Sequence, residues 1–164
     1  MGVTSSCSTF APENSGKKMV VSEMIFKPLV KVPCAILERG GKVLAAQRSE
    51  GGSLALKWEF PGGKLEEGET EEECLRRELQ EELSVEIAIG DRLPVTDRDD
   101  DTRTIRLVPF VCSLTSDTIV LTEHEQILWL TPEELPYLDW AEADRYVLRD
   151  YFAYKGIDMD SFVP

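Results

Sequence analysis

Residues 62–85, GGKLEEGETEEECLRRELQEELSV, organise the rest of the chain. Thr70 followed three residues later by Glu73 is the signature of a capping box, in which two side chains satisfy free N–H groups at a helix start. Three leucines then recur at intervals of four, which is the spacing of one apolar stripe on an α-helix. They are Leu75, Leu79 and Leu83. The stretch therefore predicts a helix that begins near Thr70 and buries a leucine stripe.

Three glutamates share one side of this predicted helix. At about 100° per residue, Glu78, Glu81 and Glu82 fall within an arc of roughly 100°, and two of them border the leucines. Like charges one turn apart repel, and partial burial makes each carboxylate costlier. A divalent cation such as Mg²⁺, which takes oxygen ligands, would neutralise them. A solvated acidic face supported by Arg76 and Arg77 is the alternative for the charge run taken alone.

The spacing of this stretch resembles the Nudix box, Gly-x5-Glu-x7-Arg-Glu-apolar-x-Glu-Glu-x-Gly-apolar. The matching residues are Gly63, Glu69, Arg77, Glu78, Leu79, Glu81, Glu82 and Val85. Ser84 stands where the family has glycine. A glycine after a helix usually takes the left-handed conformation, which serine adopts at a cost of roughly 1 kcal/mol. The departure therefore concerns local stability more than chemistry.

The resemblance implies an α/β fold, the Nudix α/β/α sandwich with a mixed central β-sheet. Apolar, β-rich runs separated by turn residues predict strands, the first two forming a hairpin. These strands are expected at residues 30–37, 42–47, 85–96, 104–114 and 126–130. Residues 97–101 are nearly all acidic and predict a solvated turn, with a second metal site as the alternative. Residues 140–154 predict an amphipathic helix that Gly156 ends.

The expected domain organisation is an N-terminal tail at residues 1–27, a Nudix domain at 28–156 and a C-terminal tail at 157–164. The tail begins with Met1, Gly2 and Ser6 in the pattern of N-myristoylation, and Cys7 follows as a palmitoylation candidate. A plain tail is the alternative. The chain has no apolar run of the 18 residues that a membrane span needs, and we expect no membrane partner.

Composition limits the class of protein and partner. A chain of 164 residues and 42% hydrophobic content is expected to form one globular domain. A net charge of −13 argues against nucleic-acid polymers and anionic membranes, which require basic surface. The four cysteines show no CxxC pair, so neither a zinc site nor a disulfide scaffold is expected, and a cytoplasmic setting fits best.

The resemblance also implies roles for residues of the box. Glu78, Glu81 and Glu82 would be the metal and base carboxylates, with the backbone carbonyl of Gly62 completing the coordination. The ion would be Mg²⁺, for which Mn²⁺ can substitute. Arg77 would orient the carboxylates, with Glu69 as its partner. Outside the box, Glu123 stands six residues before a strand tryptophan, where the MutT-type branch often has another metal or base carboxylate; a surface loop carboxylate is the alternative.

Substrate-binding candidates lie elsewhere in the chain. Arg48, Lys64 and Arg103 are candidate phosphate or base contacts. Phe60 belongs to the motif WEFPGGK, and Asp144 resembles the aspartate with which the branch reads the base. An ionised aspartate only accepts hydrogen bonds, so it suits cytosine, guanine or 8-oxoguanine, and adenine would need it protonated; helix capping is its alternative role. His124, the only histidine, is expected to be an exposed loop residue.

The motifs GGKVLAAQRS, WEFPGGK and HEQILW also resemble the (deoxy)CTP pyrophosphohydrolase group of the MutT-like branch. They imply Mg²⁺-dependent hydrolysis of a nucleoside triphosphate, such as 8-oxo-dGTP or (5-methyl-)dCTP, to the monophosphate and pyrophosphate. The role would be sanitation of the nucleotide pool. The alternatives are an ADP-ribose or nucleotide-sugar hydrolase, a non-catalytic nucleotide-binding module and an acidic structural domain. Monomer and homodimer both remain open.

Overall fold

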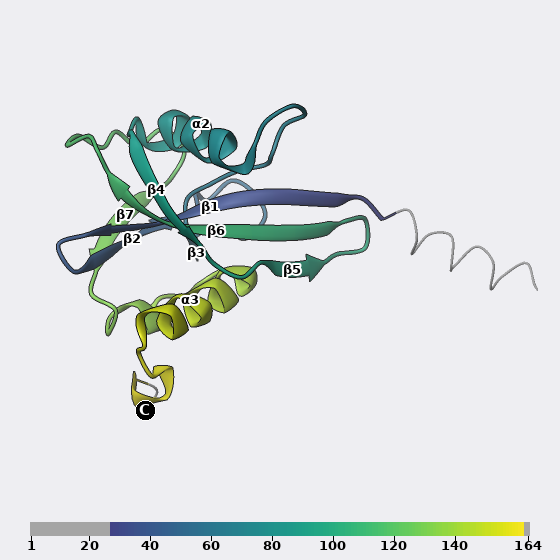
Figure 1. Cartoon of the computed structure of the whole chain (residues 1–164). Coiled ribbons are helices and arrows are strands. Elements are labelled where there is room, and N and C mark those ends of the chain that lie inside the picture. Colours follow the sequence, from purple (N-terminus) through teal and green to yellow (C-terminus); the bar gives the residue numbers. More distant parts are fainter. Residues whose placement is uncertain (1–26, 163–164) are drawn as a thin grey trace, which may run out of the picture.

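Residues 27–162, the part of the chain that the computed structural model describes, form one sheet between two helices (Figure 1). The strands are β1 (Leu29–Arg39), β2 (Lys42–Gln47), β3 (Trp58–Glu59), β4 (Ile87–Arg92), β5 (Thr96–Asp99), β6 (Thr104–Leu114) and β7 (Gln126–Leu130). The helices are α2 (Glu71–Leu83) and α3 (Glu142–Lys155), with short 3-10 helices η1 (Leu135–Tyr137) and η2 (Met159–Phe162). The lipidation pattern and residues 1–26 of the predicted tail lie outside this range.

The sheet is mixed, as the sequence predicts. Its strand order is β3-β2-β1-β6-β4, while β5 pairs with β6 and β7 pairs with β2. β1 and β6 run parallel, and the other pairs are antiparallel. The predicted hairpin of β1 and β2 is confirmed. Its turn places Gly40 at φ 57° and Gly41 at φ 75°, the positive values that a tight two-residue hairpin needs.

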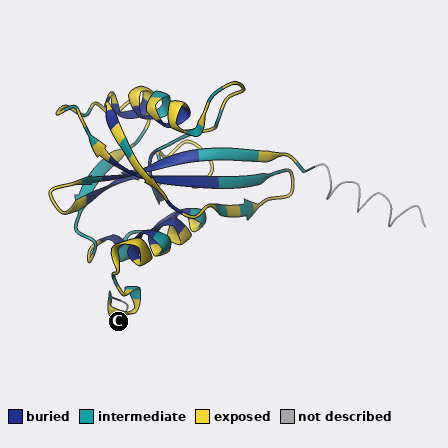
Figure 2. Cartoon of the chain, in the orientation of Figure 1, coloured by how far each residue is buried: buried dark blue, intermediate teal, exposed yellow. Residues whose placement is uncertain are grey.

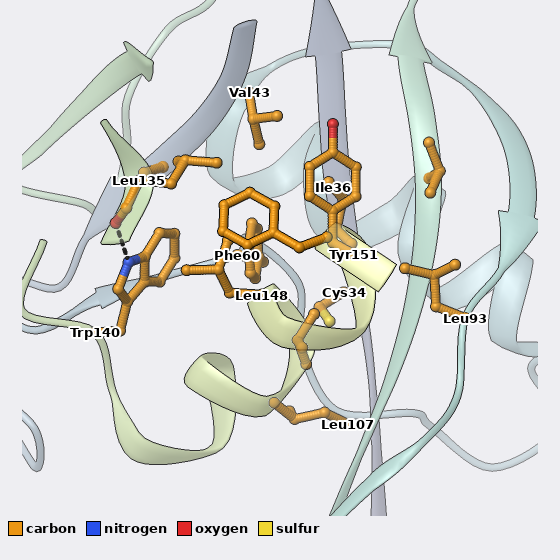
Figure 3. Close-up of a cluster of buried hydrophobic side chains, with 14 of the residues drawn as sticks. Cys34, Ile36, Val43, Phe60, Leu93, Leu107, Leu135, Trp140, Leu148 and Tyr151 are labelled. Carbon is orange, nitrogen blue, oxygen red and sulfur yellow. Dashed lines mark hydrogen bonds between the residues drawn. The ribbon is translucent and has the colours of Figure 1, made fainter. Parts of the chain in front are cut away.

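The two faces of the sheet carry separate apolar cores. Because successive strand residues point to opposite faces, Ile36 packs in the cluster under α3 and Leu37 packs in the cluster under α2. The buried surfaces of both helices face the sheet (Figure 2). In the α3-side cluster, the indole Nε1–H of Trp140 donates to the Leu135 carbonyl at 2.7 Å (Figure 3). This architecture confirms the expected α/β/α sandwich.

The central helix matches its prediction closely. The Thr70 side chain accepts from the Glu73 N–H, and the Glu73 side chain accepts from the Thr70 N–H, so the capping box is complete. The leucine stripe is fully buried. Ser84 ends the helix at φ 55° and ψ 39°, which is the left-handed conformation that the family glycine would occupy.

Three elements differ from the predictions. The expected strand at 85–96 is interrupted, and residues 97–99 of the expected acidic turn belong instead to β5, which pairs with β6. Pairing is tolerated because Arg106 sits opposite Asp97 and binds its carboxylate at 2.7 Å. The last helix begins at Glu142 rather than at 140, and Gly156 ends it at φ 70° as predicted. Among residues 27–162, no helix is long and apolar enough to cross a bilayer.

Candidate active site

A cleft of about 440 Å³ opens where β1, β3 and β6 meet the first turn of α3 and the turn before β7. The central helix contributes Glu82 to its lining, and α3 contributes Asp144. Several residues that the sequence singles out line it together: Arg48, Phe60, Gly62, Gly63, Lys64, Glu82, Arg103, Glu123 and Asp144. They come from positions almost 100 residues apart, so the fold assembles them.

Glu82 is the most unusual group in the cleft. Its residue is only 6% exposed, and its Oε2 has no hydrogen-bond partner among the described residues. Burial raises its pKa to about 9, and the neighbouring charges of Glu59, Glu78 and Glu123 add to the rise. A hydrogen bond from the Gly62 backbone opposes these effects without cancelling them. An unpaired carboxylate oxygen among acids is a suitable ligand for a divalent cation.

Arg77 holds the other acidic groups of the helix. Its guanidinium binds Glu69 at 3.0 Å, Glu78 at 2.8 Å and, more loosely, Glu81 at 3.4 Å. It also donates to the Lys64 carbonyl at 3.3 Å, which ties the helix to the loop before it. The bond from Arg77 lowers the pKa of Glu69 to about 2. Glu69 therefore remains ionised and keeps Arg77 in place.

Gly62 and Gly63, which precede the helix, lie too close to neighbouring atoms to carry a side chain. A Cβ at Gly63 would lie 2.1 Å from the carboxyl carbon of Glu78, so the absence of a side chain makes room for that carboxylate. A Cβ at Gly62 would lie 2.1 Å from the Pro33 carbonyl oxygen, because Gly62 bridges β1 at Cys34. Gly63 thus makes room for a side chain, and Gly62 makes room for backbone.

Not every predicted ligand converges on the cleft. Neither Glu78 nor Glu81 lines the cleft: the Glu78 side chain is 16% exposed, and the Glu81 side chain is 55% exposed. Within residues 27–162, no three His, Cys, Asp or Glu side chains already surround one point as metal ligands would. Glu78 and Glu81 turn toward Arg77 instead. The donor set still fits a cation, since the buried Glu82 oxygen has no other partner.

Asp144 lines the cleft from the first turn of α3. Its Oδ1 accepts the backbone N–H of Phe60 at 2.9 Å, and Phe60 stacks on Trp140 with 4.7 Å between ring centroids. Burial is the largest cause that raises the pKa of Asp144 to about 8. A raised pKa favours the protonated form of Asp144 at neutral pH, which donates a hydrogen bond as well as accepting one. Helix capping is also excluded, because Ala141 is the N-cap and no side chain caps it.

Two further residues of the cleft, Glu59 and His124, have no site role that the sequence predicts. Glu59 accepts from Arg48 Nη1 at 2.8 Å, and His124 Nε2 lies 3.0 Å from its other oxygen. The His124 side chain is only 4% exposed, so the expectation of an exposed loop histidine is wrong. Successive residues of an extended chain point to opposite faces of a sheet, and Trp58 and Phe60 both pack in the α3-side core. Glu59, between them, therefore points to the α2 side, and this alternation is the sequence signal that could have identified it. No local signal marks His124.

The remaining candidates lie at the rim. Glu123 is exposed, but its charge acts on Glu82, which places it at the acidic end of the cleft. Arg103 binds Asp100 at 3.4 Å, and Lys64 is exposed. Positive charge is therefore available around a cleft whose floor is acidic.

Comparison with known proteins agrees with the fold. The model of the NUDIX domain family matches residues 27–151. The chain is 35% identical over 128 residues to the CTP pyrophosphohydrolase of Escherichia coli (strain K12), covering 78% of this chain and 95% of that protein.

Two solved structures are similar over most of the chain. The solution structure of the E. coli ORF135 protein superposes with a TM-score of 0.70 at 34% identity, covering 79% of this chain and 92% of that chain. The solution structure of the DNA mismatch repair protein MutT, of the Nudix hydrolase family, from Methicillin Resistant Staphylococcus aureus 252 gives a TM-score of 0.66 at 40% identity. It covers 79% of this chain and 99% of that one.

Proposed function

Because this chain belongs to the NUDIX domain family, we propose that it is a nucleoside triphosphate pyrophosphohydrolase that uses the cleft between Glu82 and Asp144. It is a hydrolase of phosphoanhydride bonds acting on a small nucleotide, either modified or unmodified, such as 8-oxo-dGTP or (5-methyl-)dCTP. The products are the nucleoside monophosphate and pyrophosphate. The name of the E. coli relative, a CTP pyrophosphohydrolase, supports this reaction.

The observation that carries the proposal is the buried, unpaired oxygen of Glu82 among acidic neighbours. Divalent metals are typical of the family, and Mg²⁺ is the ion we assign, with Mn²⁺ as a substitute. Glu78, Glu81, Glu82, Glu123 and the Gly62 carbonyl would hold it. When bound, such an ion polarises phosphate oxygens and lowers the pKa of coordinated water.

Other side chains of the protein are assigned to positioning the carboxylates, to proton transfer and to phosphate binding. Arg77 is a positioning residue, since it holds Glu78 and Glu81 while Glu69 keeps it in place. Glu81, which is exposed and bound only loosely to Arg77, is the carboxylate that we assign to take a proton from the attacking water, whereas Glu78 is confined beside Gly63. Lys64 and Arg103 offset the charge of the phosphates at the rim.

The part of the cleft that Asp144, Phe60 and Arg48 line would receive the base. A protonated Asp144 both donates and accepts, so it is complementary to neighbouring donors and acceptors on cytosine, guanine and adenine alike. Adenine is therefore not disfavoured as the sequence reasoning expected, and dATP belongs in the substrate panel.

The test is hydrolysis of dCTP, 5-methyl-dCTP, 8-oxo-dGTP, dATP and ADP-ribose with and without Mg²⁺, with products identified. We expect Mg²⁺-dependent release of pyrophosphate, abolished by Glu82→Gln and kept by Glu86→Gln, an exposed carboxylate away from the cleft. Hydrolysis of ADP-ribose without pyrophosphate release from triphosphates would favour the nucleotide-sugar alternative. Nucleotide binding with no turnover would favour a non-catalytic module.

The proposal includes the setting of the enzyme. The catalytic domain is assigned to residues 28–156, and Ile157 and Met159 pack against its α3-side core. A cytoplasmic location is in keeping with the three described cysteines, Cys34, Cys74 and Cys112, which are unpaired buried thiols. The role assigned is sanitation of the nucleotide pool.

A further inference from the structure

A chain of side-chain hydrogen bonds crosses the cleft from the turn before β7 to the loop after β2. His124 Nε2 lies 3.0 Å from Glu59 Oε1, and Arg48 Nη1 donates to Glu59 Oε2 at 2.8 Å. Arg48 Nε then donates to the Ser53 carbonyl at 3.2 Å. The chain thus connects a buried imidazole to a segment at the rim of the cleft, the loop of residues 49–57.

His124 is buried although one of its nitrogens has no partner. Its side chain is 4% exposed, and Nδ1 has no hydrogen-bond partner among the described residues. A carboxylate only accepts, so Nε2 carries the hydrogen in the contact with Glu59. An apolar side chain would fill the same space without leaving a buried nitrogen unpaired. The hydrogen bond to Glu59 is therefore what histidine provides at this position and an apolar side chain would not.

The backbone on both sides of His124 is anchored. Thr122 Oγ1 donates to the Glu81 carbonyl at 2.7 Å, which fixes this turn on the end of α2. The Glu125 N–H donates to the Gln47 carbonyl at 2.9 Å, which fixes it on β2. His124 consequently holds Glu59 from a rigid support.

The loop of residues 49–57 has little else to hold its tip. Leu54 and Leu56 take positive φ values of 58° and 61°, which are costly for leucine, and both side chains are exposed. Backbone bonds close its base, where the Leu56 N–H donates to the Arg48 carbonyl and the Lys57 N–H donates to the Leu54 carbonyl. Nearer the tip, at Ser53, Arg48 supplies the side-chain bond. Residues 49 and 51–54 line the cleft.

We propose that His124 is a positioning residue that, through Glu59 and Arg48, holds the loop of residues 49–57 in its cleft-lining conformation. The consequence for catalysis rests on the proposed function, because the ordered loop is then the wall against which the nucleotide binds. Loss of the contact frees Glu59 and Arg48 to rotate, which releases Ser53. The nucleotide must then order the loop itself, so binding weakens, while the contacts of Arg77 with Glu69, Glu78 and Glu81 are not touched by the substitution.

The variants separate the two imidazole nitrogens. His124→Gln places an amide N–H where Nε2 stands, so it keeps the bond to Glu59. His124→Asn places its polar atoms near Nδ1 and loses that bond, and His124→Leu loses both. Glu125→Gln is the matched control, because Glu125 is an exposed neighbour whose side chain makes none of these contacts.

Hydrogen exchange of the loop, measured without nucleotide, is the first readout. We expect the amides of Leu56 and Lys57 to exchange about fivefold faster in the Leu and Asn variants than in the wild type, Gln and control proteins. Steady-state kinetics is the second readout: KM should rise about fivefold in the same two variants, with kcat within about twofold. Hydrogen exchange is measured without catalytic turnover. If the wild-type protein hydrolyses no nucleotide, the proposed function is contradicted, but the effect of His124 on loop exchange can still be measured.

Two results would overturn the proposal. One is unchanged loop exchange in folded His124→Leu protein, and the other is a Gln variant as impaired as the Leu variant. If His124→Leu does not fold, Arg48→Lys replaces it, since a single ammonium cannot reproduce the forked contacts with Glu59 and Ser53. In that variant the loop amides should exchange faster although His124 is in place. Exchange at the wild-type rate would refute the proposal that Arg48 holds the loop.

Discussion

The backbone N–H of Phe60 donates a 2.9 Å hydrogen bond to Asp144 Oδ1, joining the end of β3 to the first turn of α3 inside the cleft. The two residues are 84 positions apart in sequence. This contact fixes the aspartate but does not offset its burial, which raises its pKa to about 8. At neutral pH the folded protein therefore keeps a proton on Asp144 that the unfolded chain releases.

The first prediction concerns stability against pH. Between the ordinary aspartate pKa of 3.8 and the folded value of about 8, the folded state binds one more proton at Asp144 than the unfolded state. Stability from this group is therefore greatest at low pH and falls as pH rises through the window, by up to about 1.4 kcal/mol per pH unit. In Asp144→Asn this dependence disappears. The free energy of unfolding of the wild type minus that of the variant should therefore decrease from pH 5 to pH 8, measured by urea denaturation without metal. A difference independent of pH would contradict the burial argument.

The second prediction concerns metal binding. Glu82, with its pKa raised to about 9, is protonated in the metal-free protein at pH 7.5 and must lose that proton to bind a cation. Mg²⁺ affinity should therefore rise by up to about tenfold per pH unit below pH 9. Calorimetry in two buffers of different ionisation enthalpy should detect close to one proton released per ion. Glu82→Gln should bind Mg²⁺ weakly and release none; proton-neutral binding by the wild type would exclude Glu82 as a ligand.

The third prediction separates the two glycines before α2. A methyl at Gly63 meets the Glu78 carboxylate, a side chain that can move, so Gly63→Ala should lower kcat by about 10- to 100-fold with little loss of stability. A methyl at Gly62 meets the backbone of Pro33 and Cys34, so Gly62→Ala should destabilise the fold by about 1–3 kcal/mol. Thermal melts and steady-state rates on both variants test the contrast. Equal losses of stability in the two variants would show that the backbone at Gly63 does not tolerate a Cβ either.

The fourth prediction concerns Ser84. Its left-handed conformation costs serine roughly 1 kcal/mol relative to glycine. Ser84→Gly should raise the melting temperature by roughly 2–4 °C and leave kcat unchanged, because Ser84 does not line the cleft. Ser84→Ala, which keeps a Cβ in the same conformation, is the control and should bring no such gain. A lower melting temperature for the glycine variant would refute this account of the helix end.

The parts of the fold that the sequence predicts correctly depend on neighbours a few residues apart. The capping box from Thr70 to Glu73 and the stop at Gly156 depend on turn geometry, which is local. The strand β5 could not be predicted in the same way, because its acidic residues pair with β6 only once Arg106 lies opposite Asp97. The run of negative charge taken alone favours a turn.

The amino-acid sequence by itself determined the family, the central helix and the set of box carboxylates, since spacing along one helix carries that information. Only the tertiary structure decided how Glu59, His124 and Asp144 behave. Glu59 and His124 stand 65 positions apart and meet through the pairing of β2 with β3 and β7. Burial, which raises the pKa of Asp144 and Glu82, is a property of the packed sheet and helices and cannot be read from residue types.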